Sequence, residues 1–84
     1  MVLYTDFSNQ GIGAILAQEI SSTEERVIEY ASRTLKKHEA NYPAYKGEIL
    51  GACWAIEKFR YFLLQAPFKL VMDNEAAVAL LKQY

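Results

Sequence analysis

Three acidic residues of this 84-residue chain stand at positions that secondary-structure propensity alone does not explain. Asp6 lies near the end of an apolar, alternating segment, Glu48 lies beside the apolar side of a predicted helix, and Asp73 follows a short apolar run. Taken singly, they are explained as a turn residue, a solvated helix acid and a helix N-cap. They differ from the other acids because one topology brings all three together.

Three ionised carboxylates at one place repel one another and are poorly solvated unless a cation lies among them. Oxygen ligands of this kind suit Mg²⁺ or Mn²⁺. A pair of such ions about 3.5 to 4 Å apart can activate a water molecule and stabilise the leaving oxygen of a phosphodiester. The three acids therefore predict a metal site for phosphodiester hydrolysis.

The first half of the chain predicts three antiparallel strands joined by short turns. The predicted strands are Val2 to Phe7, Ile12 to Gln18 and Arg26 to Ser32. Polar and glycine-containing segments separate them, which favours a meander in which neighbours along the chain pair in the sheet.

The second half predicts a helix from Pro43 to about Leu63, a short strand from Phe68 to Met72, and a second helix from Asp73-Asn74. A strand–helix–strand crossover of this length favours a parallel fourth strand beside the first. Asp6 and Asp73 then emerge at the same carboxyl edge of the sheet, where α/β folds bind ligands, and the helix can bring Glu48 there.

The apolar period of the predicted helix indicates which side faces the core. The predicted core-facing residues are Tyr45, Ile49, Ala52, Ile56, Phe59 and Leu63, with Glu48 at their edge. A second apolar ridge contains Leu50, Trp54 and Tyr61 on nearly the opposite side, which is typical of a helix between two layers. The single cysteine, Cys53, is expected to be a buried thiol in this helix.

Composition limits the class of protein. A hydrophobic fraction of 52% and a charged fraction of 23% are typical of one small globular domain. The net charge of −1 is not the basic excess of a stand-alone nucleic-acid binder. The densest basic segment, Arg33 to His38, is either a solvated loop or a phosphate contact. We expect an intracellular protein, because the sequence shows no membrane span and no signal peptide.

Gly11 and Gly13 do not form a known glycine motif. Leu16 stands where a dinucleotide fingerprint needs its third glycine, and Ala17 stands where a calcium loop needs a glutamate. Glycine within a strand otherwise marks a bulge or a close approach of another backbone. Both explanations stay open here, the second as the passage of a nucleic-acid backbone.

Four segments in this order carry a resemblance to a known family: T-D-F-S, G-I-G-A, Y-A-S-R-T-L and W-A-I-E-K-F-R. The chain resembles the ribonuclease H domain of reverse transcriptases from gypsy-like LTR retrotransposons and related retroelements. The resemblance implies an α/β, ribonuclease H-like mixed sheet, three antiparallel strands and then a parallel fourth, with flanking helices. It also implies hydrolysis of the RNA strand of an RNA–DNA hybrid with Mg²⁺, or Mn²⁺ in its place.

Position by position, the resemblance makes Asp6, Glu48 and Asp73 the catalytic metal ligands. Ser8 and Asn74 flank these acids and either orient a substrate phosphate or 2′-hydroxyl or close a turn. The family has a fourth carboxylate further along, so we expect residues 1–84 to be a C-terminally truncated domain that lacks the final strand and C-terminal helix.

The expected partners are the hybrid and the polymerase domain of the same polyprotein, in the cytoplasm, the nucleus or a retroelement particle, with no membrane involved. The alternative function is a non-catalytic, ribonuclease H-like structural or interaction module.

Overall fold

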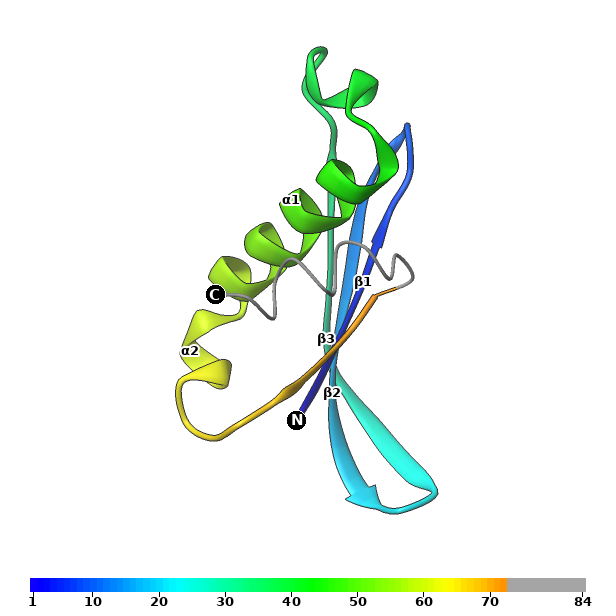
Figure 1. Cartoon of the computed structure of the whole chain (residues 1–84). Helices are drawn as coiled ribbons and strands as arrows, with labels where there is room; N and C mark the ends of the chain where they lie inside the picture. The colour runs from blue at the N-terminus through cyan, green and yellow to red at the C-terminus, as the bar shows by residue number, and fades with distance from the viewer. Residues whose placement is uncertain (73–84) are drawn as a thin grey trace.

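The computed structural model describes residues 1–72, which form a four-stranded mixed sheet with helices (Figure 1). Asp73, Asn74 and the helix predicted from them lie outside the described residues. The strands are β1 (Val2–Phe7), β2 (Gly11–Ser21), β3 (Glu24–Thr34) and β4 (Lys69–Val71), in the order β3-β2-β1-β4. β2 pairs antiparallel with both β1 and β3, and β4 pairs parallel with β1, so the predicted topology is confirmed.

The β2–β3 hairpin is longer than the sequence pattern predicts. The run of apolar and small residues in the second predicted strand ends at about Gln18, yet the two strands pair as far as Ser21 and Glu24. Side chains in this outer part of the hairpin are exposed, and backbone hydrogen bonds hold the two strands together there. Because these residues have no apolar face, their sequence pattern does not indicate a strand. The pairing is irregular between Leu16 and Ala17 and between Glu19 and Ser21, which indicates bulges there and none beside Asp6.

The connection from β3 to β4 contains the 3-10 helix η1 (Glu39–Asn41) and two α-helices, α1 (Ala44–Lys58) and α2 (Arg60–Leu63). The prediction of one continuous helix is wrong at Phe59, whose backbone angles of −104° and 16° end α1. Pro43 is the N-cap of α1, where its fixed backbone angle suits the extended conformation that precedes a helix. None of the helices in the described part of the chain is long and apolar enough to cross a membrane.

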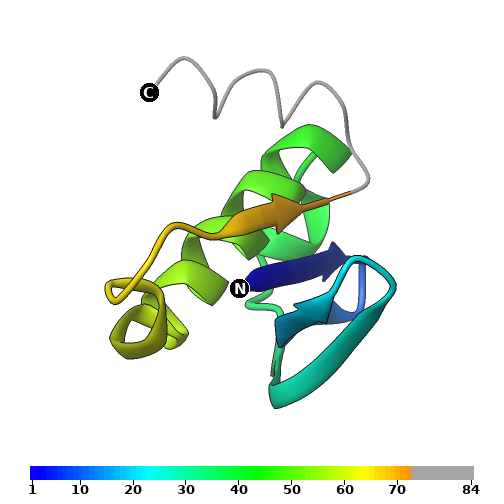
Figure 2. The ribbon, with the colours of Figure 1, turned by 90° about the horizontal axis from the view of Figure 1, so that it is seen from below.

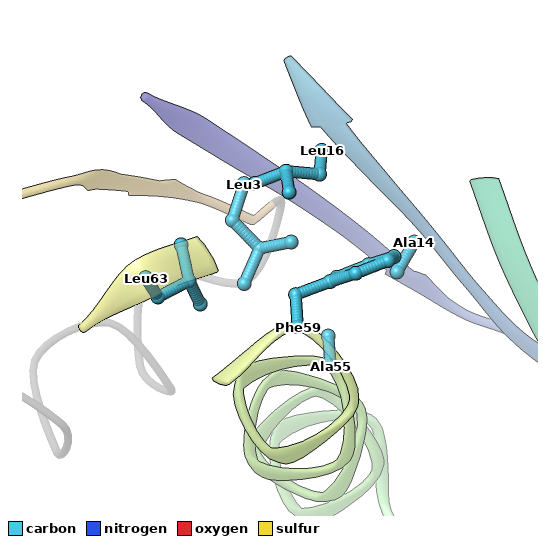
Figure 3. Close-up of a cluster of buried hydrophobic side chains, with 6 residues drawn as sticks. All are labelled: Leu3, Ala14, Leu16, Ala55, Phe59 and Leu63. Atoms are coloured by element: carbon cyan, nitrogen blue, oxygen red, sulfur yellow. The ribbon is translucent and has the colours of Figure 1, made fainter. Parts of the chain in front are cut away.

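The core lies between the sheet and one side of α1 (Figure 2). Figure 3 shows side chains from the sheet meeting those of the two helices. The buried cluster consists of Leu3, Ala14, Leu16, Ala55, Phe59 and Leu63. Its strand members share the face of the sheet that α1 covers, because alternate residues of a strand point the same way.

The side of α1 that faces the sheet is made of small residues, and the predicted core-facing stripe is wrong in part. The buried residues of α1 are Gly47, Glu48, Gly51, Ala52 and Ala55. Of the predicted stripe, Tyr45 is exposed and Ile49 and Ile56 are half-buried. The strands already present large side chains to the helix, so small helix residues let the two layers approach closely.

Cys53 is exposed, so the prediction of a buried thiol is wrong. It follows Gly51 and Ala52, which are the residues that contact the sheet, and so it points away from it. The second apolar ridge is only partly covered: Trp54 is half-buried against the core, whereas Tyr61 is exposed.

Gly47 is the position of closest approach between α1 and β1. A methyl group at Gly47 would overlap the ring of Phe7, whereas one at Gly51 would lie 3.3 Å from Cγ2 of Ile12. We predict that Gly47→Ala lowers the free energy of unfolding, because overpacking costs about 1 to 3 kcal/mol and outweighs a helix-propensity gain of about 1 kcal/mol. Urea unfolding of the chain measures the change.

Gly51→Ala is the matched control, because it brings the same gain in helix propensity with only a slight crowding of Ile12. We expect it to be neutral or slightly stabilising. Equal stability of the two variants would show that Phe7 does not require a glycine at position 47.

Candidate functional site

Asp6 lies on the open face of the sheet. It is the next-to-last residue of β1, pairs with Gly13 of β2 and is exposed. Leu3 and Thr5 point to the opposite face, which α1 covers, because side chains alternate along the strand. The carboxylate of Asp6 is therefore accessible from solvent at the carboxyl end of β1.

Glu48 lies in the second turn of α1 and is buried, with 7% of its surface exposed. The preceding residue, Gly47, is the one that meets the ring of Phe7, and Phe7 follows Asp6. One contact between helix and strand therefore fixes the two chain segments that carry Asp6 and Glu48. The former acid is exposed and the latter is enclosed between helix and sheet.

Thr5 is a buried polar residue that the sequence analysis does not single out. Its Oγ1 is inaccessible to solvent and has no hydrogen-bond partner in the described part of the chain. An unsatisfied buried hydroxyl costs about 1 to 3 kcal/mol, so such groups are rare away from functional sites. Thr5 precedes Asp6 and points to the face of the sheet that α1, the helix of Glu48, covers.

Ser8 closes the turn between β1 and β2. Its Oγ accepts a hydrogen bond from the backbone N–H of Gln10 at 3.2 Å and donates one to the carbonyl of Gly11 at 3.5 Å. The hydroxyl thus has the turn-closing role that the sequence analysis left open. Its proposed role toward a substrate stays a prediction, and Asp73 and Asn74 lie outside the described residues.

Asp6 lines a hollow of about 500 Å³ on the open face of the sheet. The pairing register places Asp6, Gly13 and Ser32 in one row across three strands, and Tyr4, Ile15 and Tyr30 in the next row. No sequence motif indicates Tyr30 and Ser32, because their position near Asp6 depends on the register of β3.

The hydroxyl of Tyr4 donates a hydrogen bond of 2.6 Å to Oε1 of Glu25 on β3. This bond and the charge of the carboxylate raise the pKa of Tyr4 above its ordinary value. The bond connects β1 to the β2–β3 hairpin at the aromatic end of the hollow.

The surroundings of Gly11 and Gly13 differ in whether they leave room for a side chain. A methyl group at Gly11 would lie 2.9 Å from the backbone carbonyl oxygen of Arg33, so the close approach of β3 requires glycine there. A methyl group at Gly13 would meet no atom within 4 Å. In the described structure, packing of the chain therefore explains Gly11 but does not require glycine at position 13, on the floor of the hollow beside Asp6.

A partly buried ion pair between Arg33 and Glu39 holds the segment that leads into α1. Nη1 and Nη2 of Arg33 lie 2.7 and 2.9 Å from the two carboxylate oxygens of Glu39. The backbone N–H of Lys36 donates to the same carboxylate at 2.8 Å. These bonds from Arg33 and then Lys36 lower the pKa of Glu39 to about 2, and the carboxylate in turn raises the pKa of Arg33.

The basic segment Arg33 to His38 was predicted to be either a solvated loop or a phosphate contact. In the structure Arg33 forms an ion pair with Glu39, whereas Lys36, Lys37 and His38 are exposed to solvent. The sequence contains both partners, but nothing in its pattern indicates that these two charged residues, six positions apart, form an ion pair with a buried carboxylate.

The donor chemistry fits a divalent cation. Asp6 and Glu48 supply carboxylate oxygens, the ligands that Mg²⁺ and Mn²⁺ prefer. Residues 1–72 contain no group of three or more acidic, histidine or cysteine side chains placed to hold a metal ion, and Asp73, the third predicted ligand, lies outside this range. Of the three predicted ligands, Asp6 and Glu48 are the two that lie within the described residues.

The fold and this set of acids define a class of protein: a mixed α/β domain with carboxylates near the carboxyl end of its central strand. The family of RNase H-like domains found in reverse transcriptases matches residues 1–84. The chain belongs to this family, which confirms the predicted resemblance and the ribonuclease H-like fold.

The chain is similar to parts of several retroelement polyproteins. It is 40% identical over 74 residues to the retrovirus-related Pol polyprotein from transposon 297 of Drosophila melanogaster. This match covers 88% of the present chain and 6% of that polyprotein. It is 46% identical over 61 residues to the corresponding polyprotein from transposon gypsy of the same species, covering 73% of the chain and 5% of that protein.

A plant virus protein is also similar. The enzymatic polyprotein of carnation etched ring virus is 33% identical over 75 residues, or 89% of this chain and 11% of that protein. The chain therefore spans only a small part of each of these relatives.

Proposed function

We propose that this chain is a ribonuclease H domain that cleaves the RNA strand of an RNA–DNA hybrid within a retroelement reverse transcriptase polyprotein. The observation that supports this most directly is the contact between Phe7 and Gly47, which fixes the segments that carry Asp6 and Glu48. Membership in the RNase H-like family agrees with this function.

In this proposal Asp6, Glu48 and Asp73 hold Mg²⁺, or Mn²⁺ in its place. The metal, when bound, supplies activation of water and stabilisation of the leaving oxygen of the phosphodiester. The exposure of Asp6 lets it meet the substrate, while the burial of Glu48 restricts its rotamers and its access to water. Ser8 and Asn74 orient a phosphate or a 2′-hydroxyl, which is the group that distinguishes the RNA strand from DNA.

The test is hydrolysis of a labelled RNA–DNA hybrid in the presence of Mg²⁺. We expect cleavage of the RNA strand, no cleavage of duplex DNA of the same sequence, and loss of activity with a chelator. The assay is run on the 84-residue chain and on the polyprotein that we propose contains it. Absence of hybrid cleavage from both would contradict the proposal.

The alternative is a non-catalytic module with the same fold, and metal linkage distinguishes the two. A ligand that binds only the folded state stabilises it, by about 2.7 kcal/mol at a concentration one hundred times its dissociation constant. We predict that millimolar Mg²⁺ or Mn²⁺ raises the unfolding midpoint of the parent chain and raises that of Asp6→Asn less. An unchanged midpoint in the parent would favour the structural module.

The proposed partners follow from the relatives. The similar proteins from Drosophila are described as Pol polyproteins, and each is much longer than the matched segment. We propose the polymerase domain of the same polyprotein as the protein partner of this domain. An intracellular location, in the cytoplasm, the nucleus or a retroelement particle, belongs to the same proposal.

A further inference from the structure

In the described part of the chain, the layer between β1 and α1 contains two buried polar side chains. The buried polar or charged residues of this part are Thr5, Glu39 and Glu48. Glu39 is bound to Arg33 before α1 begins, which leaves Thr5 on β1 and Glu48 on α1. Both are more than nine-tenths buried, with 6% and 7% of their surface exposed. These two residues therefore carry the polarity of an otherwise apolar contact between helix and sheet.

The neighbours of Thr5 in the sheet offer its hydroxyl no hydrogen bond. Leu3 and Phe7 flank it on the covered face of β1, and Ala14 is opposite it in the pairing with β2. None of these side chains has a hydrogen-bonding group, and Oγ1 of Thr5 is enclosed without a partner among residues 1–72. Valine has nearly the same branched shape and would fill the position without an unsatisfied hydroxyl. The packing of the described chain therefore does not explain why a hydroxyl stands at position 5.

Glu48 belongs to the part of α1 that lies against the end of β1. Gly47, which precedes it, lies against the ring of Phe7, and Phe7 is about 7 Å beyond Thr5 along the strand. The start of α1 and the end of β1 lie at the same end of the sheet (Figure 1). A helical side chain tilts toward the start of its helix, so that of Glu48 is directed toward the end of β1 that carries Asp6. Of the buried residues of α1, Glu48 alone has a polar side chain, so it is the polar group that this helix can offer to Thr5.

We propose that Thr5 is a positioning residue for Glu48. When a divalent cation binds, the hydroxyl of Thr5 donates a hydrogen bond to the carboxylate of Glu48 and restricts the directions in which this carboxylate can turn. Groups that donate to a ligating carboxylate orient it, and their loss typically lowers metal affinity by about 10- to 100-fold. Threonine then lowers the stability of the metal-free chain and raises its affinity for the cation. This inference rests on the proposed function, and it adds a residue that touches neither the cation nor the nucleic acid.

The first measurement compares Thr5→Val with the parent chain by urea unfolding in the presence of a chelator. The variant removes the hydroxyl and keeps the branched shape, so we expect an unfolding midpoint that equals or exceeds that of the parent. A lower midpoint would overturn the inference, because the hydroxyl would then have a structural role in the metal-free fold.

The second measurement follows the unfolding midpoint as Mn²⁺ is added. A ligand that binds only the folded state raises the midpoint, and the concentration at which it does so reports its affinity. We expect Thr5→Val to need about 10 to 100 times more Mn²⁺ than the parent for the same rise. Thr5→Ser keeps the hydroxyl but leaves a small void, so it should lower the metal-free midpoint and respond to Mn²⁺ at the concentration that the parent requires.

Thr23→Val is the matched control. Thr23 is exposed in the turn between β2 and β3, and the variant makes the same chemical change there. We expect its response to Mn²⁺ to equal that of the parent. The inference is wrong if Thr5→Val responds at the same Mn²⁺ concentration as the parent, or if Thr5→Ser and Thr5→Val lose the response equally.

Further outcomes separate this inference from the proposed function. Stabilisation by Mn²⁺ that is weakened in Thr5→Val, without cleavage of a hybrid by the parent chain or the polyprotein, would support the positioning role and contradict the nuclease. Cleavage that depends on Mg²⁺ concentration in the same way in Thr5→Val and the parent would support the nuclease and overturn the positioning role. A parent midpoint that Mn²⁺ leaves unchanged would contradict both, because Glu48 would then hold no cation.

Discussion

Under the proposed function, we expect Asp6→Asn to lower the rate of RNA-strand cleavage by about a thousandfold or more. The amide keeps the size of the side chain but loses the negative charge that we propose holds a divalent cation. Metal ions contribute several kcal/mol to phosphodiester hydrolysis, and each 1.36 kcal/mol is a factor of about ten in rate. Because Asp6 is exposed, the substitution leaves the packing of the sheet unchanged. The measurement is the single-turnover rate on a labelled RNA–DNA hybrid with saturating Mg²⁺.

Glu57→Gln is the matched control for this variant. Glu57 is an exposed acid of α1, 3.6 Å from Arg60, and the change removes the same charge from the chain. We expect its cleavage rate to equal that of the parent. If Asp6→Asn cleaves as fast as Glu57→Gln, Asp6 is not a metal ligand, and the catalytic role that we propose for it is wrong.

Glu39→Gln destabilises the fold strongly, because it leaves the guanidinium of Arg33 without its buried carboxylate partner. The glutamine carbonyl can still accept the backbone N–H of Lys36, but this bond is no longer assisted by a negative charge. Urea unfolding at neutral pH is expected to show a much lower midpoint than for Glu57→Gln, whose ion pair is exposed and contributes little.

The same ion pair predicts how stability depends on pH. The pKa of Glu39 is lowered from 4.5 to about 2, so its contribution is fully present above about pH 4.5. As the pH falls from 4.5 toward 2, the unfolded chain takes up a proton that the folded chain does not, and the free energy of unfolding decreases. We expect Glu39→Gln to lack this part of the acid-induced loss. A variant with the same decrease as the parent between pH 4.5 and 2 would show that other carboxylates cause it.

The strands show which parts of the fold can be predicted from sequence. β1 has the predicted bounds, because its alternation of apolar and polar residues continues until the turn at Ser8. The ends of the β2–β3 hairpin are not predicted, because exposed residues on both strands leave no periodic pattern. The parallel pairing of β1 with β4 is predicted from the length of the connection and the handedness of such crossovers.

The helix shows the limit of the hydrophobic pattern. The predicted stripe is right at Ala52, Phe59 and Leu63, which are buried. It misses Gly47 and Gly51, which are buried where the strands leave little space for a side chain. The volume available at a helix–sheet contact depends on both surfaces, and a sequence window contains only one of them. For the same reason the exposure of Cys53 is not predicted.

The sequence by itself determined the mixed sheet, the family and the acids Asp6, Glu48 and Asp73 as candidate ligands, because local periodicity and residue chemistry are written along the chain. Only the tertiary structure decided that Glu48 is buried, that Tyr30 and Ser32 share a hollow with Asp6, and that Arg33 is committed to Glu39. These features depend on strand register and on helix–sheet distance, and both are set by contacts between residues far apart in the sequence.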